Sequence, residues 1–142
     1  MKYNFRELTA SISACQICAE DLSHEPSPIF QLNPKARILI AGQAPVRKAH
    51  ESGIPFDDPS GDRLRDWMGI TKEIFYDASK IAILPMSFCY PGHGRTGDLP
   101  PRRECARHGG NRPCKLCQIL SANSSLVVMP SNGILMYQRK QA

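Results

Sequence analysis

Apolar residues recur at helical spacing near the start of the chain. Phe5, Leu8 and Ile12 are three and four positions apart, which places them on one face of an amphipathic helix predicted over residues 3–22. Several prolines follow within residues 23–34, and proline neither donates a backbone hydrogen bond nor fits inside a helix. We therefore predict an extended connection after the helix.

Two largely apolar runs, at residues 37–42 and 80–86, predict buried strands. Their lack of alternation with polar residues is typical of strands that are covered on both faces of a parallel sheet. Between them, a stop at Gly69 and the patterns of residues 60–68 and 72–76 predict two short helices. The order of strand, helices and strand predicts an α/β fold with a parallel sheet.

Loops rich in glycine and proline follow both strands. The first, over residues 42–60, should be irregular and lies at the carboxyl end of a strand, where open parallel sheets bind their ligands. It leads to Ser60 or Asp62, either of which is able to cap the next helix. The second loop covers residues 90–103. We expect a ligand site beside the first loop.

Composition narrows the class of protein. A chain of 142 residues predicts one compact domain. No apolar run approaches the roughly 20 residues of a membrane helix, and the first 20 residues contain no secretory signal pattern. We therefore expect a soluble, cytoplasmic monomer. Lys and Arg exceed Asp and Glu by 18 to 13, which favours a polyanionic partner.

Cysteine spacing indicates metal chemistry. Cys15 and Cys18 form a C-x2-C pair, and Cys89 and Cys105 lie downstream with 15 residues between them. In a reducing compartment such cysteines are metal ligands or plain thiols more often than disulfides. Four thiolates suit an iron–sulfur cluster, and a two-residue gap lets one turn supply two of them.

Two other interpretations of the cysteines remain open on spacing alone. Cys114 and Cys117 form a second C-x2-C pair, which together with the first pair is able to hold zinc. The gap of 95 residues between the pairs is much longer than the roughly 15 to 20 residues of common zinc sites. Alternatively, Cys89 and Cys105 are buried thiols without a metal.

The first loop also carries a candidate site for a flat ligand. Gly42-Gln43-Ala44-Pro45 turns the chain after a buried strand, and Phe56 returns later in the same loop. This arrangement places Gln43 in a cleft, where its amide is able to orient a water, while Phe56 is able to stack on a base. The alternative is an ordinary turn with a core aromatic.

Basic side chains surround the two strands along the chain. They are able to form a phosphate-binding rim, or else to be solvated surface charges. The candidates are Arg47, Lys48, His50, Arg63, Arg65, Arg95, Arg102 and Arg103.

Taken in order, these motifs resemble the uracil-DNA glycosylase superfamily, and within it the iron–sulfur branch termed family 4 and related bacterial proteins. The match covers residues 10–106: a C-x2-C pair, a strand ending in Gly-x-Ala-Pro, a Gly-x-Pro-Phe loop, and a strand that leads to a cysteine. A Pro/Gly/Arg loop and a fourth cysteine complete it. The resemblance implies a 4Fe-4S cluster whose ligands are Cys15, Cys18, Cys89 and Cys105.

The resemblance also implies a fold and an activity. The fold is a three-layer α/β/α domain around four parallel strands, and the activity is hydrolysis of the N-glycosidic bond of uracil flipped out of DNA. Phe56 occupies the position of the aromatic that stacks on uracil. Gly42, Gln43, Ala44 and Pro45 occupy the position of the water-activating motif.

Three departures from the family pattern bear on catalysis. Gln43 replaces a glutamate, and glutamine takes up no proton at neutral pH, although it still aligns a water. Pro85 stands where the uracil-reading asparagine is expected. A His-Pro-Ser-like segment has no counterpart, because none of the four histidines sits in such a motif: His24, His50, His93 and His108.

The end of the chain has a different character from the rest. We predict a glycosylase-like domain over residues 1–106 and an atypical tail over residues 107–142. A two-base shift of permissive codons for residues 125–142 allows Gly-His-Ala-Ile-Lys-Trp-Tyr, which resembles the family's segment there. This favours a frameshifted or truncated reading of a longer gene.

Two functions follow as hypotheses. The first is a DNA-repair glycosylase in which Gln43 orients water and Phe56 stacks on the base. The second is a non-catalytic iron–sulfur module, or inactive remnant, that binds DNA through its basic loops. A zinc-binding nucleic-acid module is a third, more distant hypothesis.

Overall fold

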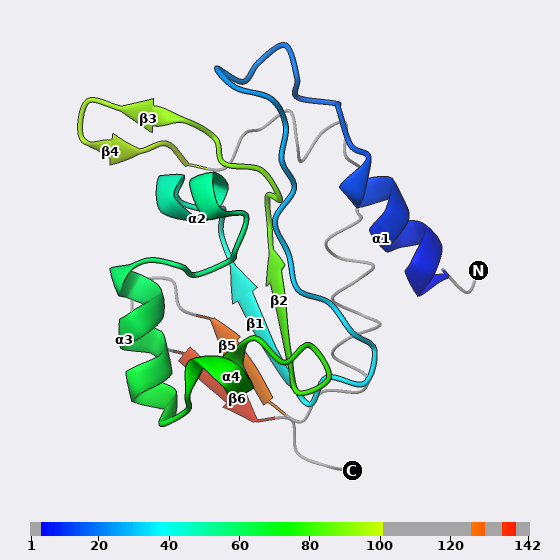
Figure 1. The fold of residues 1–142 in the computed structure, drawn as a ribbon, viewed down its shortest axis with the longest axis vertical. Coiled ribbons are helices and arrows are strands. Elements are labelled where there is room, and N and C mark those ends of the chain that lie inside the picture. Colours follow the sequence, from blue (N-terminus) through cyan, green and yellow to red (C-terminus); the bar gives the residue numbers. More distant parts are fainter. Residues whose placement is uncertain (1–3, 101–125, 130–134, 139–142) are drawn as a thin grey trace.

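A four-stranded sheet with helices on both faces forms the framework of the protein (Figure 1). The computed structural model describes residues 4–100, 126–129 and 135–138. In space the strands follow the order β2-β1-β5-β6. Their bounds are Ile38–Gly42 for β1, Ile81–Pro85 for β2, Leu126–Met129 for β5 and Leu135–Gln138 for β6.

The centre of the sheet is parallel, as the apolar runs predict. β1 pairs in parallel with β2 on one side and with β5 on the other. The implied set of four parallel strands is wrong for the described sheet, because β6 runs antiparallel to β5. Only residues 130–134 separate these two strands, and a parallel connection needs about a dozen residues or more.

One face of the sheet packs on the helix near the start of the chain. Helix α1, Phe5–Ser13, begins at Asn4, whose side chain accepts a hydrogen bond from the backbone N–H of Arg6. Its buried residue, Ile12, packs with Leu39 of β1 and Leu84 of β2 in one hydrophobic cluster.

The opposite face packs on α3, Pro59–Met68, and α4, Lys72–Phe75. Leu64 and Phe75 from these helices join Ile40 and Ile83 from the strands in a second hydrophobic cluster. Because neighbouring strand residues enter opposite clusters, both strands are covered on both faces. The predicted α/β/α architecture is therefore confirmed (Figure 1).

The helix predicted over residues 3–22 is too long. α1 ends at Ser13, and the chain continues through hydrogen-bonded turns, one of which joins the N–H of Leu22 to the carbonyl of Cys18. Ile12 is the last apolar side chain that reaches the core from this helix, whereas Ile17 is 42% exposed. Continuing the helix would bury little additional apolar surface, and short helices depend on such burial.

The predicted loops contain regular elements that the sequence analysis missed. Residues 42–60 include α2, Arg47–Ser52, which stops at Gly53 in a left-handed conformation. The loop after β2 contains the two-residue strands β3, His93–Gly94, and β4, Gly97–Asp98, which pair antiparallel.

Over residues 4–100, 126–129 and 135–138 no helix is long and apolar enough to cross a membrane.

The N-cap of α3 also differs from the two predicted candidates. Asp58 caps the helix, because its side chain accepts a hydrogen bond from the N–H of Gly61. Pro59 then occupies the first helical position, where its missing N–H costs nothing. Ser60 and Asp62 lie inside the helix.

Two neighbours on α4 provide a test of the second cluster. Phe75 is fully buried, whereas Ile74 is 38% exposed. We expect Phe75→Ala to lower the free energy of unfolding by about 3–5 kcal/mol, because the truncation leaves a cavity. Ile74→Ala is the matched control and should cost less than about 1.5 kcal/mol. Urea unfolding measures both, and equal losses would contradict the cluster.

Candidate active site

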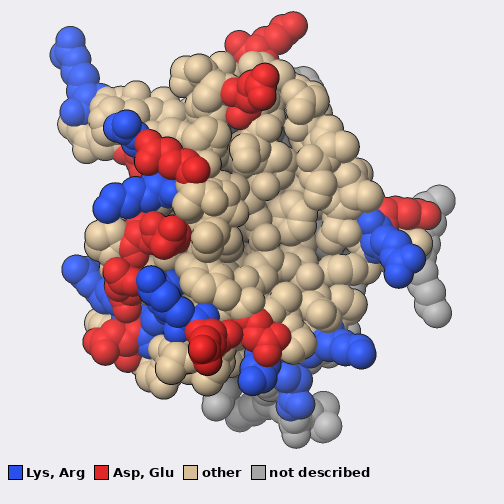
Figure 2. All heavy atoms as spheres, in the orientation of Figure 1, with Lys and Arg blue, Asp and Glu red and all other residues tan. Residues whose placement is uncertain are grey.

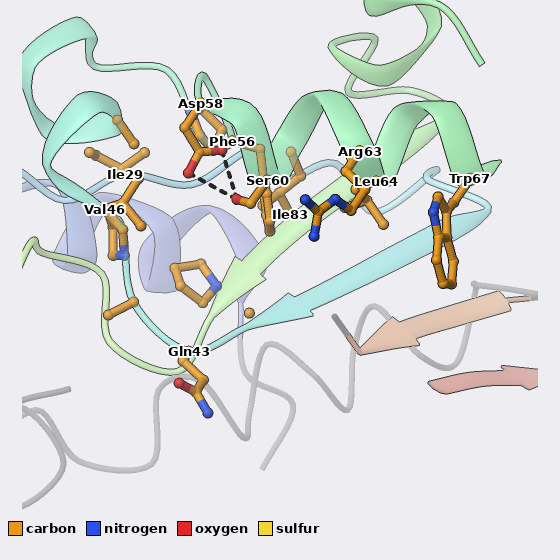
Figure 3. A pocket seen from close by; sticks show the side chains of 16 residues that line it. Ile29, Gln43, Val46, Phe56, Asp58, Ser60, Arg63, Leu64, Trp67 and Ile83 are labelled. Atoms are coloured by element: carbon orange, nitrogen blue, oxygen red, sulfur yellow. Dashed lines mark hydrogen bonds between the residues drawn. The ribbon is translucent and has the colours of Figure 1, made fainter. Parts of the chain in front are cut away.

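A cavity of about 390 Å³ opens beside the carboxyl ends of β1 and β2. The end of β1, the loop after it and one side of α3 enclose it (Figure 3). Its volume falls in the range of small-molecule sites, which is about 300–1,000 Å³. The lining residues are Ile29, Gly42, Gln43, Ala44, Pro45, Val46, Ala49, Pro55, Phe56, Asp58, Ser60, Arg63, Leu64, Trp67, Ile83 and Pro85.

All five residues that the sequence analysis assigned to the base and the water line this one cavity: Gly42, Gln43, Ala44, Pro45 and Phe56. The loop backbone is held by the chain beyond β2. The N–H of Met86 donates to the carbonyl of Gly42, and the N–H of Ser87 donates to the carbonyl of Gln43, both at 2.9 Å. The turn is therefore a fixed part of the sheet edge.

Gln43 and Phe56 occupy different parts of the site. The Gln43 side chain is exposed, and its amide extends away from the Phe56 ring (Figure 3). Gly42 lies closer to that ring, because a Cβ added to it would stand 3.7 Å from the Cζ atom of Phe56. To orient a water beside Phe56, the Gln43 side chain has to turn into the cavity.

Phe56 has a constrained backbone. Its φ is 57°, in the left-handed region that residues with a side chain rarely adopt. Such a conformation costs about 1–3 kcal/mol, so the surrounding structure must hold it. Gly61 packs directly on this backbone, because a Cβ added there would lie 1.9 Å from the Phe56 carbonyl oxygen. The ring itself meets Phe75 edge to face at 6.0 Å.

Asp58 is the carboxylate among the cavity-lining residues, and the sequence analysis missed it. Its Oδ1 accepts hydrogen bonds from the N–H of Gly61 and the hydroxyl of Ser60, each at 2.8 Å. Both side chains lie beside Phe56 at the start of α3 (Figure 3). The helix N-terminus favours the negative charge. The signal in the sequence was the Asp58-Pro59 pair, which is typical of a helix start.

The predicted basic rim is only partly present. Arg63 lines the cavity, and Arg47 is exposed and pairs with Glu51 at 2.9 Å. The prediction that Arg65 belongs to the rim is wrong, because Arg65 is only 4% exposed and its guanidinium lies in the protein interior. Figure 2 shows Lys and Arg interspersed with Asp and Glu on this face rather than gathered. Arg102 and Arg103 lie outside the described residues.

Pro85 ends β2 opposite Gly42 and lines the cavity. Proline has no side-chain donor or acceptor and no backbone N–H. The position therefore supplies shape to the cavity, while the hydrogen bonds that read the edge of a base must come from other residues.

Three of the predicted ligands, Cys15, Cys18 and Cys89, lie within the described residues. Cys18 is buried, and Cys15 and Cys89 are half-buried. Beyond the C-x2-C pair the chain runs beside the segment that carries Cys89, because the N–H of Ile29 donates to the carbonyl of Phe88 at 2.7 Å. Within the described ranges no three His, Cys, Asp or Glu side chains are grouped as a metal site. Cys105, Cys114 and Cys117 lie outside those ranges.

Two histidines, His24 and His50, pack together outside the cavity. The rings of His24 and His50 have centroids 4.2 Å apart, and both rings lie within 5.6 Å of the Tyr90 ring. The Nε2 atom of His24 and the Nδ1 atom of His50 are buried and have no hydrogen-bond partner among the described residues. Burial, followed by the nearby His24, lowers the pKa of His50 below its ordinary value. Neither ring lines the cavity, and His108 lies outside the described residues.

The fold and cavity together define an α/β domain with an aromatic-lined, base-sized site at its strand ends. A family model described as the uracil DNA glycosylase superfamily matches residues 29–131. The chain belongs to this superfamily, whose substrate is DNA. The match includes the cavity loop and the three parallel strands β1, β2 and β5.

The lowered pKa of His50 makes stability depend on pH. The unfolded chain binds protons at His50 near pH 6.5, but the folded chain does so only at lower pH. The contribution of neutral His50 to stability is therefore fully present above about pH 7.5. It falls as the pH drops below about 6.5 toward the lowered pKa of the folded state.

We expect His50→Gln to reduce the loss of stability between about pH 7.5 and 5.5. Urea unfolding at both pH values measures it. His93→Gln is the control, because the His93 side chain is 59% exposed. An unchanged pH dependence in the His50 variant would contradict the assignment.

Proposed function

We propose that this protein binds a uracil base flipped out of DNA and hydrolyses its N-glycosidic bond slowly. The observation that carries the proposal is the position of Phe56 in the strand-end cavity of a chain that belongs to the uracil DNA glycosylase superfamily. An aromatic face held in a concave site is suited to a flat base. Members of the superfamily act on DNA, so the flipped base is the natural occupant.

Recognition of the base depends on stacking in this proposal. Phe56 offers a ring whose backbone is constrained and whose edge rests on Phe75. Gly42 leaves room beside the ring, because any larger side chain there would point toward Phe56. Arg63 lies on the cavity wall and is suited to contact a DNA phosphate. Affinity for DNA should therefore fall with salt.

Hydrolysis requires the oxygen of a water to bond to C1′ of the sugar while the bond to N1 of uracil breaks, and the proton that the water loses passes through solvent to the departing uracil. Positive charge develops on the sugar and negative charge on the departing base. The Asp58 carboxylate is suited to stabilise the sugar, because it lines the cavity at the N-terminus of α3. Gln43 aligns the water when its side chain turns inward, but it takes up no proton. Turnover should therefore be slow.

We also propose the iron–sulfur branch of the superfamily, with a 4Fe-4S cluster held by Cys15, Cys18, Cys89 and Cys105. The donor set fits, since four thiolates are the usual ligands of a cubane. The hydrogen bond from Ile29 to Phe88 supports it, because it brings the chain beyond the C-x2-C pair beside the residue before Cys89. When bound, the cluster would supply covalent links between the start of the chain and the segment after β2.

A second candidate is a DNA-binding module without catalysis. Two observations favour it: the exposed Gln43 amide extends away from Phe56, and Pro85 provides no hydrogen bond to the base. Under this alternative the stacking contact and the phosphate contacts remain, but water is not activated. Base preference in binding is then retained, whereas uracil release is absent.

Binding and release from one oligonucleotide test both candidates. The wild-type protein should prefer a single-stranded DNA with one deoxyuridine over the matched thymidine DNA, as measured by fluorescence anisotropy. We expect Phe56→Ala to lower this preference about tenfold, since base stacking is worth about 1–3 kcal/mol. Non-specific affinity should be nearly unchanged.

Single-turnover release of uracil then separates the glycosylase from the non-catalytic module. Slow release that falls about 100-fold in Asp58→Asn supports the glycosylase, because that variant removes the negative charge and keeps the shape. Preference without any release supports the module. Rapid release that Gln43→Ala abolishes would show that the site is not impaired. No preference and no release would overturn both.

Iron analysis tests the cluster. Anaerobically purified protein should be brown and contain about four irons per chain. Cys89→Ser and Cys105→Ser should each lose iron, because each removes one thiolate ligand. Cys114→Ser is the matched control and should keep it. Full iron content in the first two variants would contradict the ligand set, and zinc that disappears in Cys114→Ser would favour the zinc site.

A further inference from the structure

A buried arginine lies behind the cavity aromatic and holds its backbone. Arg65 is 4% exposed on α3. Its Nη1 donates to the carbonyl oxygen of Phe56 and to the hydroxyl of Tyr76, each at 3.2 Å. Its Nη2 pairs with Asp62 at 2.6 Å. Asp62 is mostly exposed, so the charge is compensated from the solvent side while the other donors face inward.

Tyr76 extends the same network to the preceding residue. Its hydroxyl donates to the carbonyl oxygen of Pro55 at 2.8 Å while it accepts the bond from Arg65. Burial is the main cause that raises the pKa of Tyr76, which keeps the hydroxyl protonated as a donor. Two successive carbonyls of the loop are therefore held by two side chains that also hold each other.

Two aromatic rings, those of Phe75 and Tyr76, also contact the Arg65 guanidinium. The Arg65 guanidinium carbon lies 5.0 Å from the centre of the Phe75 ring and 5.6 Å from that of Tyr76. Phe75 in turn meets the edge of Phe56. The guanidinium thus contacts both the backbone of Phe56 and the ring on which the Phe56 side chain rests.

This network explains how Phe56 keeps its unusual conformation. A residue at φ 57° relaxes toward negative φ unless its neighbours prevent it. Such a rotation moves the carbonyl away from Arg65 and swings the ring out of its contact with Phe75. A lysine at the same position offers a single ammonium group, which does not reproduce the planar fork that serves the Phe56 carbonyl, Tyr76 and Asp62 together.

We propose that Arg65 is a positioning residue that fixes the Phe56 ring for stacking on the flipped base. Tyr76 supports it by bonding both to Arg65 and to the carbonyl of Pro55 in the same loop. This inference rests on the proposed function, because it gives the aromatic its role toward the base. Neither side chain lines the cavity, so both act through Phe56.

The test compares Arg65→Lys and Tyr76→Phe with a matched control in the full chain. Arg6→Lys makes the same change at an exposed residue of α1. Each protein is studied well below its melting temperature, so that the folded fraction is the same. The first readout is the ratio of dissociation constants for thymidine and deoxyuridine DNA. We expect this ratio to fall about tenfold in Arg65→Lys and less in Tyr76→Phe.

The second readout does not depend on DNA. Chains that contain 4-fluorophenylalanine give fluorine resonances from Phe56 and Phe75, and Phe56→Leu assigns the first. Loss of the network should shift or broaden the Phe56 resonance in Arg65→Lys. Phe5, Phe30 and Phe88 are internal controls, because they pack in or against the cluster on the other face. Their resonances should remain unchanged.

The outcomes separate this inference from the proposed function. A wild-type protein without uracil preference contradicts the function, while a changed Phe56 resonance in Arg65→Lys still supports the positioning role. A wild-type preference that Phe56→Ala removes and Arg65→Lys keeps, with an unchanged Phe56 resonance, overturns the inference alone. A lower melting temperature with both readouts unchanged assigns Arg65 a purely structural role and also overturns it.

Discussion

The parallel pairing of β1 with β2 is the constraint on which the rest of the molecule depends. The register places Gly42 opposite Pro85, so both strands end at the same level. The chain beyond β2 then donates two backbone hydrogen bonds to the carbonyls of Gly42 and Gln43. Strands that are buried on both faces have little freedom to slip. The packing of the core therefore sets the position of the turn after β1.

The first two turns of α3 link this core to the cavity. Asp58 caps the helix, Gly61 allows the Phe56 backbone to approach, and Arg65 bonds to the Phe56 carbonyl. The helix also packs Leu64 into the cluster beneath the sheet. The strain of the Phe56 conformation is thus offset by a helix that is itself anchored by burial. Rigidity at the aromatic is a consequence of packing on the sheet.

The sequence predicted the parts of this arrangement that depend on hydrophobic pattern. Apolar runs located β1 and β2, and the loop that follows β1 contains Gln43 and Phe56, which both line the cavity. The length of α1 was overestimated, because the sequence does not reveal that Ile17, beyond its last turn, stays 42% exposed.

Arg65 shows why other features escaped prediction. An arginine in a polar stretch is usually exposed, and only the tertiary structure brings the carbonyl of Phe56, the hydroxyl of Tyr76 and two rings around its guanidinium. Asp58 was missed for a related reason, since local sequence identifies a helix cap but not the cavity that the cap faces. The grouping of four cysteines stays a prediction.

Base binding and bond cleavage place different demands on this cavity. Stacking needs a held ring, and the supports of Phe56 are complete within the described residues: Gly61 below its backbone, Arg65 at its carbonyl and Phe75 at its edge. Cleavage needs charges that face the reacting atoms. Asp58 is the cavity's carboxylate, Gln43 is neutral, and Pro85 has no side-chain donor or acceptor. Under the proposed function, Gln43 and Pro85 therefore slow the chemical step, whereas the apolar shape of the site still allows a base to stack.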